Sequence, residues 1–149
     1  EVEPGILFVE RQFGVLELHA PDAAAVERAG EAILKGINAE PSHQLKPRIL
    51  YSDIIENITD QHAVIVNRNR QASMVLPGET LLVYEMTPAL FAAMAANEAE
   101  RVAPDVTVVD IAMIGATGRI YMSGKTESII KARDEITRVL EAVIGREQK

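Results

Sequence analysis

One segment of the chain imitates a phosphate-binding loop, Ser123-Gly-Lys-Thr126. Such a loop needs another glycine five positions before Gly124, but Arg119 stands there, and Gly118 lies one position too far. The intervening Ile120 to Met122 are also typical of a strand rather than of a loop around phosphates. We therefore predict no nucleotide site in this segment.

The sequence contains few other residues in a pattern that could perform catalysis or bind a metal. The sequence contains no cysteine, which excludes thiol catalysis, disulfides and cysteine-based zinc sites. Three histidines are present, and none has the paired spacing of metal ligands: His19, His43 and His62. Because no nucleophile and base form a recognisable pair, we predict no enzyme, no catalytic residue, no metal and no cofactor.

Small residues gather in the segment Gly115-Ala-Thr-Gly118, between two β-prone runs at 106–114 and 120–122. This pattern predicts a strand, a glycine turn and a second strand. A helix is expected to follow and to stop near Gly145, because apolar residues recur there at helical spacing: Ile129, Ile130, Ala132, Ile136, Val139, Leu140 and Val143. Read alone, the glycine segment is also compatible with an anion-binding nest in a small-ligand or allosteric α/β domain.

The same unit occurs near the beginning of the chain. Residues 6–9 and 15–18 predict two strands, and Asp22 predicts the N-cap of a helix with Val26, Ala29, Ile33 and Ile37 on its inner face. Aligning Gly14 with Gly118 gives an offset of 104 residues for the strands, and the helices align at an offset of 103. We therefore predict two copies of one small α/β module, the first incomplete, occupying residues 1–44 and 45–149.

Further elements are expected within the second copy. Residues 48–51, 62–66 and 80–85 predict strands. Thr87 and Pro88 then predict the N-cap and first position of a helix that continues to Arg101. That helix is rich in alanine, which permits close approach of another element.

The charge and hydropathy of the chain exclude two classes of partner. The net charge is −7 and no basic cluster occurs, so the sequence does not predict a nucleic-acid-binding protein. No apolar run approaches the roughly 18 residues of a membrane span, so no membrane partner is expected.

Three longer segments, 79–101, 105–111 and 114–118, resemble the bacterial microcompartment shell domain. Two further segments resemble the tandem-domain subclass of this family, whose members form pseudohexameric trimers. Residues 58–78 resemble the entry segment of its second, circularly permuted domain, and residues 9–14 resemble the pore segment of its first domain. Within this subclass, the resemblance is closest to the carboxysomal type with a gated pore. It implies an α/β fold of the α+β sandwich kind, with two ferredoxin-like, circularly permuted shell domains. Because the family carries strands and a helix before the first pore segment, the first domain is expected to be incomplete.

The resemblance also implies the function of a flat hexagonal shell tile in a cytoplasmic microcompartment. Ile114, Gly115, Ala116, Thr117 and Gly118 would line its central pore, with Glu10 and Arg11 as gate residues and Arg101 at the tile edge. The residues alone leave the Glu10–Arg11 pair open between a gate and a solvated ion pair. The implied partners are two further copies in a homotrimer, as one ring or two stacked rings, other hexameric and pentameric shell proteins, and small metabolites.

Overall fold

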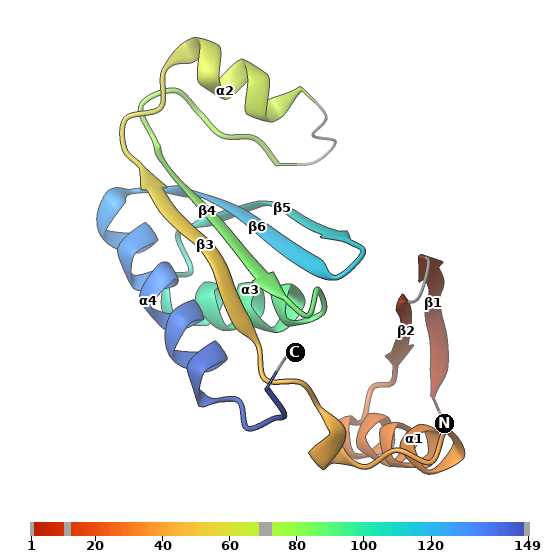
Figure 1. The fold of residues 1–149 in the computed structure, drawn as a ribbon. Coiled ribbons are helices and arrows are strands. Elements are labelled where there is room, and N and C mark those ends of the chain that lie inside the picture. The colour runs from red at the N-terminus through yellow and green to blue at the C-terminus, as the bar shows by residue number, and fades with distance from the viewer. Residues whose placement is uncertain (1, 11–12, 69–72, 148–149) are drawn as a thin grey trace. The chain divides into compact units, whose positions relative to one another are not determined.

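The computed structural model describes residues 2–10, 13–68 and 73–147 of the 149-residue chain (Figure 1). These residues form two compact units, one within 1–46 and 144–149 and the other within 47–143. No helix in the described ranges is long and apolar enough to cross a membrane.

The unit at 47–143 is built on a four-stranded antiparallel sheet with the order β3-β4-β6-β5. The strands are β3 (Arg48–Ile55), β4 (Thr80–Thr87), β5 (Thr107–Ile114) and β6 (Thr117–Gly124). Helices α3 (Phe91–Val102) and α4 (Thr126–Ala142) pack on one face of the sheet, and α2 (Asp60–Asn67) lies over the other (Figure 1). The predicted strand, turn, strand and helix at the end of the chain are confirmed.

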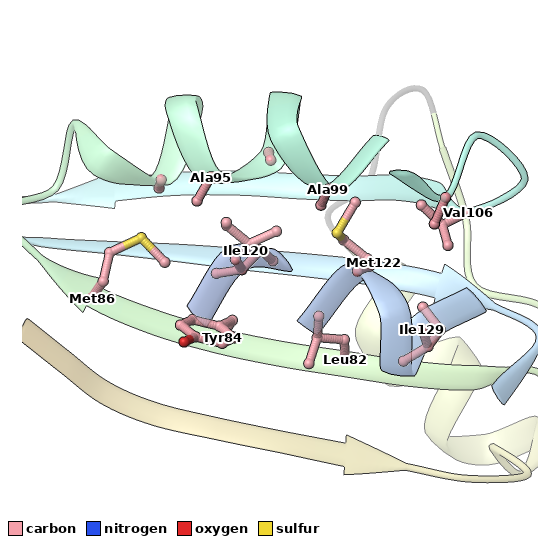
Figure 2. Packing of buried hydrophobic residues seen from close by; sticks show 14 of the residues in the cluster. Leu82, Tyr84, Met86, Ala95, Ala99, Val106, Ile120, Met122 and Ile129 are labelled. Carbon is pink, nitrogen blue, oxygen red and sulfur yellow. The ribbon is translucent and has the colours of Figure 1, made fainter. Parts of the chain in front are cut away.

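The main core lies between the sheet and the helix pair α3 and α4. Alternate residues of β4 and β6 enter it, and the alanines of α3 pack beside them (Figure 2). The alanine-rich helix therefore does approach the sheet closely, as predicted. At the edge of this core the Tyr84 hydroxyl lies 2.9 Å from Oγ1 of Thr137, and burial raises the pKa of Tyr84 above its usual value.

The opposite face of the sheet is partly covered by α2 and by the segment 73–77 that follows it. Ala63 of α2 and Val75 of this segment join Leu81 and Val109 in a second, smaller core. The side chain of Asn67 bonds to the backbone N–H and carbonyl of Val75 at 2.9 and 2.7 Å, which fixes the segment beside the helix.

The prediction of a strand at 62–66 is wrong, because these residues belong to α2. Thr59 caps this helix, its Oγ1 accepting a hydrogen bond from the backbone N–H of His62 at 3.3 Å, and Asp60 lies in the first turn. The run Ala63 to Val66 has the composition of a strand, but the cap that precedes it starts a helix. Of α2, only Ala63 is fully buried.

The other unit consists of a hairpin and a helix. Strands β1 (Glu3–Glu10) and β2 (Phe13–His19) pair antiparallel, and α1 (Ala23–Gly36) follows, with the short 3₁₀ helix η1 (Pro41–His43) after it. Asp22 caps α1 as predicted, its carboxylate accepting a hydrogen bond from the N–H of Ala24 at 3.1 Å. The C-terminal segment also belongs here, since Arg146 exchanges backbone hydrogen bonds with Gln44 and Lys46, each 2.8 Å long.

The prediction that the apolar face of α1 is buried is only partly correct. Ile33 and Ile37 are 36% and 66% exposed, and Ala25 is the only fully buried residue of the helix. Their counterparts on α4 are buried because α4 packs on a four-stranded sheet and on α3, whereas the described part of this unit offers two strands. Gly145 does not end α4, which stops at Ala142.

Candidate functional site

The glycine segment forms the tip of the β5–β6 hairpin. Ile114 pairs with Thr117, so only Gly115 and Ala116 make the turn. Gly115 has a φ of +58°, and a glycine with positive φ at the first central position is the pattern of a tight hairpin turn. The side chain of Ile114 is 67% exposed. The tip is therefore short, accessible and uncharged.

Thr117 and Gly118 do not belong to the turn, because both are already part of β6. Gly118, one of the residues predicted to line a pore, is buried. A Cβ atom at this position would overlap the carbonyl oxygen of Ala89 and lie 2.7 Å from the Cβ of Ala92. Gly118 is therefore the residue that lets the hairpin pass directly beneath the start of α3.

The end of β4 holds the turn from one side. The hydroxyl of Thr87 donates a hydrogen bond to the carbonyl of Ala116 at 3.0 Å. Thr87 is therefore not the N-cap of the following helix as predicted; it closes β4, and α3 begins four residues later at Phe91 without a side-chain cap. The turn is supported by Thr87 at its tip and by Gly118 at its base.

The pairing of β1 with β2 ends at a position that corresponds to the end of the β5–β6 pairing. Glu10 pairs with Phe13, and this pair lies 104 residues before the Ile114–Thr117 pair that closes the β5–β6 hairpin. Helices α1 and α4 begin at Ala23 and Thr126, an offset of 103. Arg11, one of the two predicted gate residues, lies outside the described residues. The backbone of Glu10 is the last position of β1.

Comparison with known proteins gives a close relative. The chain is 40% identical over 146 residues to the carboxysome shell protein CcmP of Synechococcus elongatus, with 98% of this chain and 68% of that protein covered. This chain belongs to the bacterial microcompartment shell proteins. The family model described as the CsoS1D N-terminal domain matches residues 1–43 of this shell protein.

Solved structures agree with this assignment. The shell protein is similar to the double-ringed trimeric shell protein MSM0271 from the RMM microcompartment, with 66% identity, a TM-score of 0.96 and coverage of 99% of this chain and 72% of that one. It is also similar to the fused permuted hexameric shell protein MSM0275 from the same microcompartment, with 49% identity, a TM-score of 0.88 and coverage of 96% and 71%. The permuted shell-domain fold expected from the sequence is confirmed, and the relatives are structural proteins rather than enzymes.

An ion pair that sequence reasoning missed lies next to the turn of this shell protein. Arg119 donates to the Glu85 carboxylate through Nε and Nη2, at 3.0 and 2.6 Å, and its Nη1 lies 3.4 Å from the Tyr121 hydroxyl. Tyr121 and Glu85 together raise the pKa of Arg119 above its usual value. Only the cross-strand register reveals the pair, since 34 residues separate its members. Because Glu85 balances the charge of Arg119, the pair adds no net charge beside the turn.

Arg101, the predicted edge residue, lies in the last turn of α3. Its guanidinium is 3.1 Å from the Glu98 carboxylate one turn earlier, and its side chain is 72% exposed. The position on an exposed helix end leaves most of the guanidinium accessible to a neighbouring molecule.

The imitation of a phosphate-binding loop has no structural basis in the shell protein. Ser123 and Gly124 end β6, Lys125 is the N-cap position of α4, and Thr126 begins that helix. The hydroxyl of Thr126 lies 2.7 Å from that of Thr80. Within the part of the chain that the structure describes, no group of three metal-ligating side chains occurs.

Replacing Thr87 by valine tests the support of the turn. Valine has the shape of threonine but cannot donate to the Ala116 carbonyl, so we expect a loss of about 1 kcal/mol in the free energy of unfolding. Hydrogen exchange of the amides at 115–117 should accelerate by about fivefold, as a local loss of this size implies. Thr107→Val, at the far end of β5, serves as the control and should leave those amides unchanged. Equal exchange in both variants would contradict the role given to Thr87.

Proposed function

We propose that this shell protein forms a trimeric, pseudohexameric tile with a central pore. Each chain carries two paired strands followed by a helix twice, at an offset of 104 residues in the strands and 103 in the helices. Three chains then supply six related units, which is the number a hexagonal ring needs. The trimeric shell protein that is 66% identical to this chain over the aligned residues supports the same assembly.

The two hairpin turns are the proposed lining of the pore. The observation that carries this proposal is the shared register of the strands: the pairs Glu10–Phe13 and Ile114–Thr117 lie at corresponding positions, 104 residues apart. Around a threefold axis the β1–β2 and β5–β6 turns would alternate. The uncharged β5–β6 tip brings backbone N–H and C=O groups close to a passing solute, and these groups supply fixed partial charges.

The proposed gate lies in the β1–β2 turn. Ile114, Gly115, Ala116 and Thr117 carry no charge, and the nearby Arg119 is balanced by Glu85, so the charge of the pore comes from Glu10 and Arg11. Three glutamates and three arginines can pair across the ring and narrow it, or turn apart and widen it. Local charge of this kind selects small metabolites by sign.

The tile would join the other hexameric and pentameric shell proteins through its edges. Arg101 is the proposed edge contact, since its exposed guanidinium has donors to spare beyond the bond to Glu98. A ring of this kind needs no cofactor, because it acts by assembly and by passage of solutes.

Removing the charges of the proposed gate one at a time tests the function. Shells assembled with the full-length protein and a packaged enzyme report how fast an anionic substrate enters. We expect Arg11→Gln to slow entry and Glu10→Gln to speed it, each by about three- to tenfold, because a ring of like charges in a narrow opening changes local solute concentration.

Lys35→Gln is the matched control, since it removes a charge from the last turn of α1 rather than from the hairpin tip. It should leave the entry rate unchanged. Variants at positions 10 and 11 that behave like this control, with normal assembly, would show that the charges do not face the pore.

A further inference from the structure

Ile114 is a large apolar residue held in solvent at the tip of the β5–β6 hairpin. Its side chain is 67% exposed, and the two turn residues that follow it, Gly115 and Ala116, are small. Burial of such a side chain stabilises a fold, whereas exposure to water does not. Ile114 therefore contributes little to the packing of its own unit.

The cross-strand register shows which way the Ile114 side chain points. Met113 pairs with Gly118, and a Cβ atom at Gly118 would meet α3, so Met113 lies on the helix side of the sheet. Successive residues of a strand point to opposite faces. Ile114 and its partner Thr117 therefore point to the face opposite to α3.

The polar groups nearest to Ile114 along β6 are already engaged. The hydroxyl of Thr117 donates to the Ile114 carbonyl at 3.4 Å, so it turns toward the backbone. Two residues further along the strand, the Arg119 guanidinium is paired with the Glu85 carboxylate at 2.6 Å. The surroundings of the Ile114 side chain are therefore apolar at its own level and balanced in charge at the next.

We propose that Ile114 forms an apolar constriction in the pore, which slows ions of either sign and admits small uncharged molecules. This inference rests on the proposed tile, in which three Ile114 side chains surround the axis. At the corresponding position of the first hairpin, 104 residues earlier, stands Glu10, and its partner Phe13 is 36% exposed. When the Glu10 carboxylate turns away from the axis, apolar side chains still surround the opening.

The selectivity of such a ring follows from hydration. An ion gives up bound water only where the wall supplies charges or hydrogen bonds instead, and an isoleucine side chain supplies neither. An uncharged polar molecule loses much less free energy when it leaves water. Ile114 therefore separates charged from uncharged solutes even in the open pore, whereas Glu10 and Arg11 separate solutes by the sign of their charge.

The test uses shells assembled with the full-length protein and loaded with a dye that three small quenchers reach: iodide, caesium and uncharged acrylamide. Shells that lack this protein give the background entry through other tiles. We expect Ile114→Ser to raise the entry of both ions relative to acrylamide by about fivefold or more, the change in partition that one hydrogen bond from the wall implies. Changes at Glu10 or Arg11 should instead move iodide and caesium in opposite directions.

Met113→Ser is the matched control. It makes the same kind of change one residue earlier, on the helix side of the sheet, where Met113 is 39% exposed. It should leave all three entry rates unchanged. A second variant, Ile114→Phe, separates this inference from the proposed tile, because a larger side chain beside the axis should slow all three quenchers.

Each other outcome overturns a stated claim. An unchanged ratio of ions to acrylamide in Ile114→Ser, a rise for one ion alone, or an equal rise in Met113→Ser would overturn the constriction. Loss of the ring in Ile114→Ser, measured by light scattering, would overturn it too, because the side chain would then be buried between chains. If Ile114→Phe changes no entry rate in assembled shells, the β5–β6 turn does not line a pore, and the proposed tile is wrong. If Ile114→Phe slows all three quenchers while Ile114→Ser leaves the ratio unchanged, the pore stands and only the constriction is wrong.

Discussion

Replacing Gly118 by valine is expected to destabilise the unit at 47–143 by about 2 to 3 kcal/mol, the cost of forcing extra atoms into a packed core. For a unit of this size the loss corresponds to a fall of roughly 10 to 20 °C in Tm. A Cβ at Gly118 would meet the backbone carbonyl of Ala89 and the Cβ of Ala92. Because the first of these is backbone, it cannot rotate away, so either α3 or the hairpin must move.

The consequence extends to the proposed pore. Movement of the hairpin base would also strain the bond from Thr87 to the Ala116 carbonyl, which fixes the tip. The shell protein with valine at Gly118 should therefore assemble poorly even at temperatures where it remains folded.

Gly30→Ala provides the control for this prediction. Gly30 occupies the interior of α1, and among the described residues no atom outside its chain neighbours and the backbone of its own helix lies within 4 Å of a Cβ built there. Alanine there should stabilise the helix by about 0.5 to 1 kcal/mol, because glycine loses more conformational entropy on folding. The Tm of both variants, measured by thermal melting, tests this prediction. An unchanged Tm for Gly118→Val would mean that α3 does not lie so close to β6.

The sequence predicted the second unit well where one periodic signal dominated. Alternating apolar residues located β5 and β6, and the i, i+3, i+4 spacing located α4, because both elements bury one face in the same core. Asp22 was also identified correctly, since its cap is a local interaction. Local and periodic signals of this kind do not depend on distant parts of the chain.

Three features could not be predicted from the sequence. In one, strand-like composition conflicted with a helix cap, and the other two depend on contacts between residues far apart in the sequence. The run 63–66 has strand composition, but the cap at Thr59 made it helical. Thr87 looked like a cap before Pro88, whereas its hydroxyl bonds to Ala116, 29 residues away. The Glu85–Arg119 pair depends on strand register, which composition does not fix.

The burial of α1 shows a different limit of pattern reasoning. Ile33 and Ile37 have the spacing of an inner helix face and remain exposed in the described residues of their unit. The pattern predicts which side of a helix is apolar, but only the fold determines what covers that side.

In the proposed tile, three copies of the β5–β6 turn surround one axis. The chain contains no cysteine, so Ala116→Cys introduces a single thiol at the exposed tip of the turn. A reagent with three maleimide arms can join three such thiols only when they lie around a common point. Lys131→Cys, at an exposed position on α4, is the matched control.

The decisive measurement is therefore the mass of the full-length Ala116→Cys protein under denaturing conditions after reaction with the three-armed reagent. If three turns surround the axis, most of the protein runs as a covalent species of three chains, while the control remains mainly single chains. Single chains in both proteins, with the native assembly intact, would show that the β5–β6 turn does not lie at the axis and would contradict the proposed pore.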